Sequence, residues 1–162
     1  HAAKIVKNQF PNSKFFLLGP LDTNNPAGIT LNQITQWSED GYIDYLGTSD
    51  QVSDKILLSD CIVLPSYREG VPRSLLEGAA MGRPLIATDV PGCKETIEDG
   101  LNGFLCMPRD AEDLADKMIT LIKLSHEERQ SMGYKGREKV RIEFDEKIVI
   151  ENYLSAIYDA IN

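Results

Sequence analysis

The chain has 162 residues, enough for one domain with a single hydrophobic core. It is 42% hydrophobic and 26% charged, which excludes an intrinsically disordered protein. Its formal net charge of −8 argues against a nucleic-acid-binding protein, because a polyphosphate backbone would be repelled. No apolar run is long enough to span a bilayer, and the cysteine usage fits a cytoplasmic protein.

Strand and helix patterns alternate along the chain, as in a parallel sheet with helices on both faces. Strands are expected over residues 14–18, 43–46, 61–64, 85–88 and 103–107, with 61–64 buried on both faces. A polar loop is expected over 22–28. Helices are expected over 1–9, 31–39, a short segment ending at 58, 73–81, a short segment within 90–96, 110–124, 125–143 and 145–161. The predicted fold class is α/β: a Rossmann-like parallel sheet sandwiched by helices, with a helical C-terminal run.

Several predicted helices carry capping residues at their starts. Thr30 precedes the helix over 31–39, and Ser49 or Asp50 precedes the short helix ending at 58. Further capping signals begin the C-terminal helices, namely Asp110, the capping box of Ser125 with Glu128, and Asp145.

The chain begins within a helix, without the strand that normally opens the first βαβ unit of an open α/β sheet. No linker divides the sequence. We therefore interpret residues 1–162 as one domain that is truncated at its N-terminal edge.

The sequence contains no pattern typical of a metal site. Cys61, Cys93 and Cys106 are widely spaced and form no C-x-x-C pair, and no D-x-D motif follows a predicted strand. We expect the cysteines to be small core residues rather than reactive thiols. No metal and no other cofactor is expected.

The segment Leu64–Glu77 leaves a predicted buried strand, crosses a loop and enters a helix. Ligands bind at this edge of open α/β sheets. Pro72 suits the first helical position, where its missing N–H group costs nothing. The N–H groups of Arg73, Ser74 and Leu75 are then expected to lack helical acceptors and to form a phosphate-sized anion site.

Two carboxylates frame this expected anion site. Glu69 precedes Gly70, which lets the backbone approach a ligand, and Glu77 lies one helical turn after Arg73 on the same face. One acceptor on each side of a bound diphosphate suits a nucleotide sugar, with ribose at one end and hexose at the other. On spacing alone, the alternative interpretation is a solvated helix residue and a loop charge.

Short motifs extend this pattern along the chain: Glu69-x7-Glu77 with Gly70-Val-Pro72, Leu76-Glu77-Gly-Ala-Ala, Gly82-Arg-Pro84, Thr88-Asp-Val-Pro-Gly-Cys-Lys-Glu95 and Asn102-Gly-Phe104. Together they resemble the donor-site signature of family 4 of the retaining glycosyltransferases, which have the GT-B architecture of two Rossmann-like domains. The resemblance is strongest to members that assemble capsular, O-antigen or glycan-carrier oligosaccharides on polyprenyl diphosphate. Pro91-Gly92 departs from the usual Gly-Gly of the family.

The resemblance implies the C-terminal, donor-binding half of a metal-independent transferase. Such an enzyme moves a hexose or N-acetylhexosamine, with retention, from a nucleotide diphosphate sugar, by default UDP, to a lipid-linked or oligosaccharide acceptor. Glu69 would contact the donor sugar as the catalytic residue, and Glu77 would hold the ribose hydroxyls. The implied donor-binding backbone comprises Gly70, Val71, Pro72, Arg73, Ser74 and Leu75, with Gly47 and Thr48 near the nucleobase.

The resemblance also implies groups that this sequence lacks. Family members carry an Arg and a Lys around the first strand of this domain, which stabilise the leaving diphosphate, and an N-terminal acceptor domain. The implied partners are the donor and that acceptor domain, onto which the last helix tends to cross back. The full-length enzyme would associate peripherally with the inner face of a membrane. We expect the chain alone to bind donor weakly and to catalyse no transfer.

Two other functions stay open at this stage. A nucleotide-sugar epimerase of the same architecture would use carboxylates and histidines in the cleft, whereas His126 lies in a distal helical region. A non-catalytic binding module would keep only the fold, and the presence of both glutamates beside the glycine-proline loop speaks against it.

Overall fold

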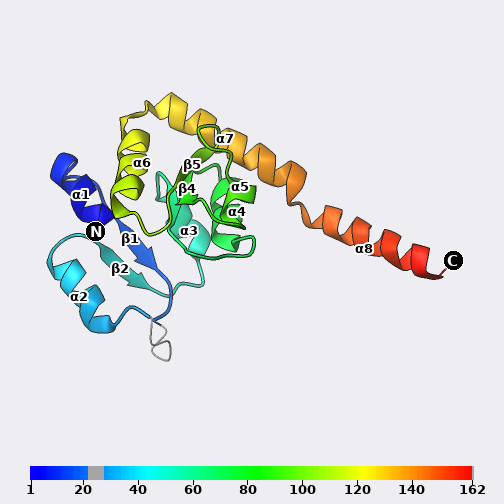
Figure 1. The fold of residues 1–162 in the computed structure, drawn as a ribbon, viewed down its shortest axis with the longest axis horizontal. Helices are drawn as coiled ribbons and strands as arrows, with labels where there is room; N and C mark the ends of the chain where they lie inside the picture. The colour runs from blue at the N-terminus through cyan, green and yellow to red at the C-terminus, as the bar shows by residue number, and fades with distance from the viewer. Residues whose placement is uncertain (22–27, 162) are drawn as a thin grey trace.

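A computed structural model describes residues 1–21 and 28–161, and the predicted alternation of strands and helices is confirmed there (Figure 1). The predicted loop over 22–28 lies, apart from Gly28, outside the described residues. The elements are α1 (Ala2–Gln9), β1 (Phe16–Leu18), α2 (Leu31–Glu39), β2 (Asp44–Gly47), α3 (Val52–Leu57), β3 (Ile62–Leu64), α4 (Arg73–Ala80), β4 (Leu85–Thr88), α5 (Cys93–Thr96), β5 (Gly103–Cys106), α6 (Ala111–Lys123), α7 (His126–Glu143) and α8 (Glu146–Ile161).

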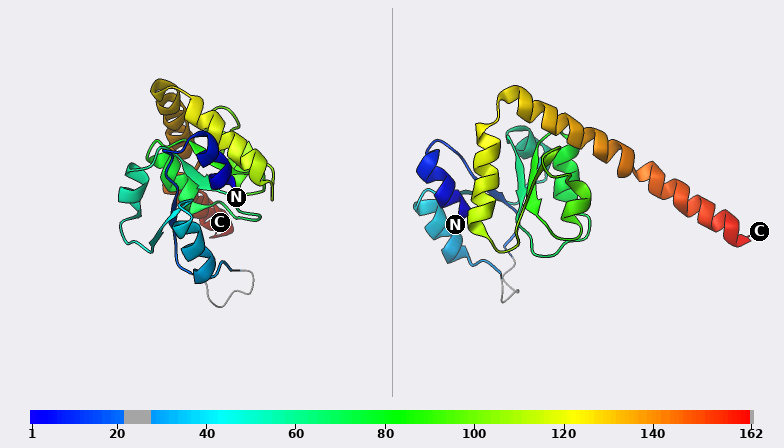
Figure 2. Two further views of the ribbon diagram at one scale, coloured as in Figure 1. Left: turned by 90° about the vertical axis from the view of Figure 1, so that its left-hand side faces the viewer. Right: turned by 45° about the horizontal axis from the view of Figure 1, so that its top comes forward.

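The described strands form two parallel sheets rather than one. β1 pairs with β2, and the second sheet has the order β3-β4-β5. Helix α6 packs on β4 and β5 and also on α1, while α4, α5 and α7 cover the other face of the three-stranded sheet (Figure 2). The α/β class with helices on both faces and a helical C-terminal run is therefore confirmed.

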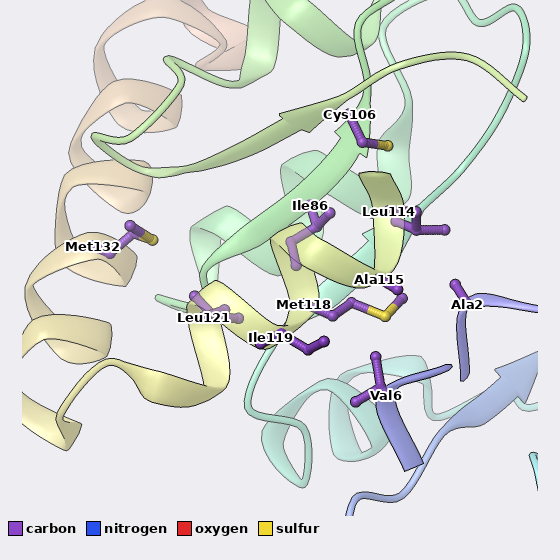
Figure 3. Packing of buried hydrophobic residues seen from close by; sticks show 10 residues of the cluster. All are labelled: Ala2, Val6, Ile86, Cys106, Leu114, Ala115, Met118, Ile119, Leu121 and Met132. Atoms are coloured by element: carbon purple, nitrogen blue, oxygen red, sulfur yellow. The ribbon is translucent and has the colours of Figure 1, made fainter. Parts of the chain in front are cut away.

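The core has one cluster on each face of β4, because the side chains of a strand alternate between its faces. Ile86 points toward α1 and α6, where Val6 and Met118 pack beside it (Figure 3). Leu85 and Ala87 point toward α4 and α5. All of β4 is buried.

The prediction that residues 61–64 are buried on both faces is wrong. Every side chain of β3 is only half-buried, although all of them are apolar. The physical reason is that β3 pairs with β4 on one side only, so its other edge carries no neighbouring strand within the described residues.

The predicted caps Thr30, Asp110, Ser125 and Asp145 are confirmed, since each side-chain oxygen accepts a backbone N–H group at the start of its helix. The cap predicted at Ser49 or Asp50 is wrong. Gln51 is the N-cap residue of α3, and the Ser49 hydroxyl instead accepts the Gln51 N–H group at 3.0 Å, which tightens the preceding turn.

Helix α8 extends away from the two-sheet body (Figure 1). Large apolar side chains along it face solvent, with Tyr153 69% and Ile157 52% exposed. None of the helices in the described ranges is both long and apolar enough to cross a membrane.

Helices α4 and α7 pack closely because α7 carries glycines at the contact. A Cβ atom added to Gly133 would lie 1.9 Å from the Gly82 carbonyl oxygen. At Gly136, on the same helix, the nearest atom would be the Ala79 Cβ at 3.6 Å, an ordinary contact.

These two glycines give a matched pair of substitutions. We expect Gly133→Ala to lower the free energy of unfolding by about 1–3 kcal/mol, because the helices must separate. Gly136→Ala should leave it unchanged or raise it by about 0.5–1 kcal/mol, since alanine favours a helix over glycine. Urea unfolding of both variants tests this, and equal effects would contradict the close α4–α7 packing.

Candidate functional site

The predicted strand-to-helix corner is formed by β3, the loop over residues 65–72, and α4. Pro72 has an extended backbone with φ −76° and ψ 122° and is the N-cap residue, so its prediction as the first helical residue is wrong by one position. Its carbonyl oxygen accepts the N–H groups of Leu75 at 3.1 Å and Leu76 at 3.2 Å.

The expectation that three amides at this corner lack acceptors is therefore corrected for one of them. The Leu75 N–H group is taken by Pro72, because the helix opens with a tight first turn. The N–H groups of Arg73 and Ser74 have no acceptor within the described residues. Two donors at the positive end of the α4 dipole thus stay free for an anion.

Glu77 is not packed into the core. Its side chain is 45% exposed, and its carboxylate lies 3.9 Å from the Arg73 guanidinium, one turn toward the start of α4. An exposed pair of this kind contributes little to stability, and the Arg73 side chain is 91% exposed. The carboxylate therefore faces the corner and can still accept hydrogen bonds from a ligand.

Glu69 is half-buried, and the loop that carries it touches the turn between β4 and α5. A Cβ atom added to Gly92 would lie 1.7 Å from the Gly70 carbonyl oxygen and 2.7 Å from that of Glu69. Gly92 also has φ +89°, a left-handed conformation, and its N–H group donates to the Glu95 carboxylate. Only glycine allows these two backbones to approach so closely.

Cys93 lies beside this contact as a buried free thiol. Burial raises its pKa, and the negative charges of Glu69 and Glu95 raise it further. Burial also raises the pKa of Cys61, and that of Cys106 to about 11. The thiols are therefore protonated at neutral pH, so Cys93 adds no negative charge to the site.

Tyr67 and Arg109 meet at the same edge of the sheet, and the sequence reasoning missed their contact. Tyr67 belongs to the β3–α4 loop and Arg109 to the turn that follows β5. The Arg109 guanidinium lies 5.1 Å from the centre of the Tyr67 ring, within the range of a cation–π contact. A signal was present in Pro108-Arg109, which resembles a turn but lacks the usual glycine.

Gly47 and Thr48 lie at the carboxyl end of β2, in the two-stranded sheet rather than beside the β3–α4 corner. Gly47 has φ +67°, and its carbonyl oxygen accepts the Gly19 N–H group at 2.8 Å. Thr48 is exposed. Their predicted place near the nucleobase stays a prediction.

A small hollow of about 40 Å³ lies at the opposite edge, where β3 and β4 begin. It is lined by Asp60, Arg83, His126 and Arg129, among others. The two guanidinium groups donate to carbonyl oxygens at the ends of α3 and α6, so their role is structural. His126 therefore lies away from the two glutamates. Across the described residues no group of three or more His, Cys, Asp or Glu could hold a metal ion.

The Gly92 contact predicts a sharp difference between two neighbouring glycines. We expect Gly92→Ala to lower the free energy of unfolding by about 1–3 kcal/mol, because its Cβ atom would overlap the Gly70 carbonyl and its backbone is left-handed. Gly70→Ala has open space around its Cβ atom and an ordinary φ, so we expect little change in stability. Thermal unfolding of both variants provides the measurement, and a stable Gly92→Ala protein would refute the contact.

Known proteins resemble this chain over most of its length. The family model of glycosyl transferases group 1 matches residues 1–139. A relative from Campylobacter jejuni, N,N'-diacetylbacillosaminyl-diphospho-undecaprenol alpha-1,3-N-acetylgalactosaminyltransferase, is 31% identical over 92% of this chain and 38% of its own. The N-acetyl-alpha-D-glucosaminyl L-malate synthase of Bacillus anthracis is 35% identical over 98% of this chain and 40% of its own.

A solved structure shows the same fold. S. aureus TarM in complex with fondaparinux, alpha-GlcNAc-glycerol and UDP has a TM-score of 0.83 and 24% identity, over 95% of this chain and 31% of TarM. Such neighbours are glycosyltransferases of GT-B architecture. The chain spans 38% and 40% of the length of the two relatives above. From the matched residues and the fold, the chain belongs to the glycosyl transferases group 1 family, whose named members are glycosyltransferase enzymes.

Proposed function

We propose that this chain is the donor-binding part of a retaining, metal-independent glycosyltransferase that uses a nucleotide diphosphate sugar. The observation that carries the proposal is the β3–α4 corner, where two free amides lie between two glutamates. Its chemistry suits a diphosphate with a hydroxyl-bearing group on each side.

The diphosphate would bind at the start of α4. The free N–H groups of Arg73 and Ser74 can donate to its oxygens, and the positive end of the helix dipole favours its charge. Val71 and Gly70 precede these donors on an exposed stretch of backbone. Because Leu75 already donates to Pro72, it would shape the corner without contacting the ligand.

The two glutamates would bind the two ends of the donor. Glu77, exposed and directed toward the first turn, would accept hydrogen bonds from the ribose hydroxyls. Glu69 would contact the sugar, because its loop is held on the far side of the free amides by Gly92. Carboxylates form strong charge-assisted hydrogen bonds with hydroxyl groups.

The proposed chemistry is attack by an acceptor hydroxyl on the same face as the leaving diphosphate. The free amides at the corner would stabilise negative charge that develops on the departing phosphate oxygens. Further cations are needed, because the chain carries a formal charge of −8 and both glutamates lie near the diphosphate. We propose that the whole protein supplies them, and that the chain alone transfers no sugar.

The names of similar proteins suggest the substrate class. Two curated relatives transfer N-acetylhexosamine groups by name, and TarM was solved with UDP. We therefore propose a UDP-linked hexose or N-acetylhexosamine as donor and a lipid-linked or oligosaccharide acceptor. The place of action would be the cytoplasm, at the inner face of a membrane.

The sheet edges support a larger domain in the whole protein. β1 and β3 each lack a partner on one edge within the described residues, and Phe15 and Val63 contact the same α1–α6 core cluster. We propose that a further strand lies between β1 and β3 and joins the sheets. An acceptor-binding domain would cover the exposed apolar side chains of α8.

Substitution of Glu77 tests the donor site. In the full-length protein we expect Glu77→Ala to weaken binding of UDP and of UDP-N-acetylglucosamine about 10- to 100-fold, since a charged hydrogen-bond acceptor is lost. Glu127→Ala, at an exposed glutamate of α7, serves as the matched control and should bind like the unaltered protein. Calorimetric titration measures both, and failure of the unaltered protein to bind any UDP, GDP or ADP sugar would refute the proposal.

Hydrogen exchange tests the additional strand. Alternation along β1 and β3 directs the N–H groups of Phe16, Leu18 and Val63 away from β2 and β4. We expect these amides to exchange more slowly in the full-length protein than in this chain alone. Unchanged exchange at all of them would exclude a strand at this position.

A further inference from the structure

The turn between β5 and α6 contains an unusual backbone conformation. The Asp110 N–H group donates to the Met107 carbonyl oxygen at 3.4 Å, with Pro108 and Arg109 between them. Arg109 has φ +62°, and within the described residues it alone among non-glycine residues has a positive φ. Proline followed by a positive φ is the pattern of a type II turn, whose third position favours glycine or asparagine. An arginine there therefore calls for a functional explanation.

The side chain of Arg109 supplies a candidate explanation. Its guanidinium lies 5.1 Å from the centre of the Tyr67 ring. No carboxylate lies within ion-pairing distance of it in the part of the chain that the structure describes, and the neighbouring Asp110 caps α6 instead. Its positive charge is thus directed to the aromatic ring.

Tyr67 precedes Glu69 by two residues in the β3–α4 loop, and its side chain is 63% exposed. β5 and β3 flank β4, so the Arg109–Tyr67 contact crosses the carboxyl end of β4. On the other side of Glu69, Gly92 touches the Gly70 carbonyl. The loop is therefore held immediately before and immediately after the glutamate.

We propose that Arg109 is a positioning residue for the donor site, which holds Glu69 in place through Tyr67. The inference rests on the proposed function, since Glu69 is the group that would contact the sugar. Loss of the contact should weaken binding of the sugar part of the donor and leave binding of the nucleotide part unchanged. A purely structural role would affect both equally.

Asparagine at position 109 tests this without disturbing the turn, because it tolerates a positive φ and carries no charge. In the full-length protein we expect Arg109→Asn to keep its melting temperature. Amide exchange at residues 68–70 of the unliganded protein should become about two- to five-fold faster, and the dissociation constant for UDP-N-acetylhexosamine should rise by a similar factor, with that for UDP unchanged. Tyr67→Ala should act in the same way, and the double variant should be no worse than either.

The conservative variants Arg109→Lys and Tyr67→Phe keep a cation and a ring and should restore both readouts. Exchange and sugar-nucleotide affinity in Arg109→Asn equal to those of the unaltered protein would overturn the inference, as would equal losses for UDP and the sugar nucleotide. If the unaltered protein bound no nucleotide sugar, the proposed function would fail, and exchange of the unliganded loop would still decide whether Arg109 holds it.

Discussion

The close approach of Gly92 to the Gly70 carbonyl is the constraint on which the candidate site depends. It joins the turn after β4 to the loop after β3, and it leaves no room for a side chain. The loop can therefore neither collapse onto the sheet nor swing freely, and Glu69 stays on one side of the start of α4. The same backbone geometry keeps Pro72 in place as the N-cap residue, which leaves two helix amides directed outward.

The rest of the domain supports that corner. Helices on both faces bury β4 completely, so the strand ends below the loop are fixed by packing. In contrast, β1 and β2 form a separate sheet that meets the remainder mainly through α1 and α6. This difference explains why the β3–α4 corner is well defined in the chain, whereas the connection between the two sheets relies on helix packing.

Much of this arrangement is encoded in local sequence patterns. Capping residues such as Ser125 and Thr30 and the apolar run of β4 give elements that agree closely with the structure, because these signals act within a few residues. Features that depend on distant partners were missed or wrong. The half-buried state of β3, the acceptor for Leu75 and the Arg109–Tyr67 contact depend on strand pairing, the geometry of the first turn of α4, and the meeting of two loops.

The central claim is that a diphosphate binds to the amides at the start of α4. Backbone amide chemical shifts of the full-length protein, followed during titration with UDP, test it most directly. The account predicts large shifts for the Arg73 and Ser74 N–H groups, with a much smaller change at Leu75, which already has an acceptor. Saturating UDP that moves neither the Arg73 nor the Ser74 resonance would contradict it.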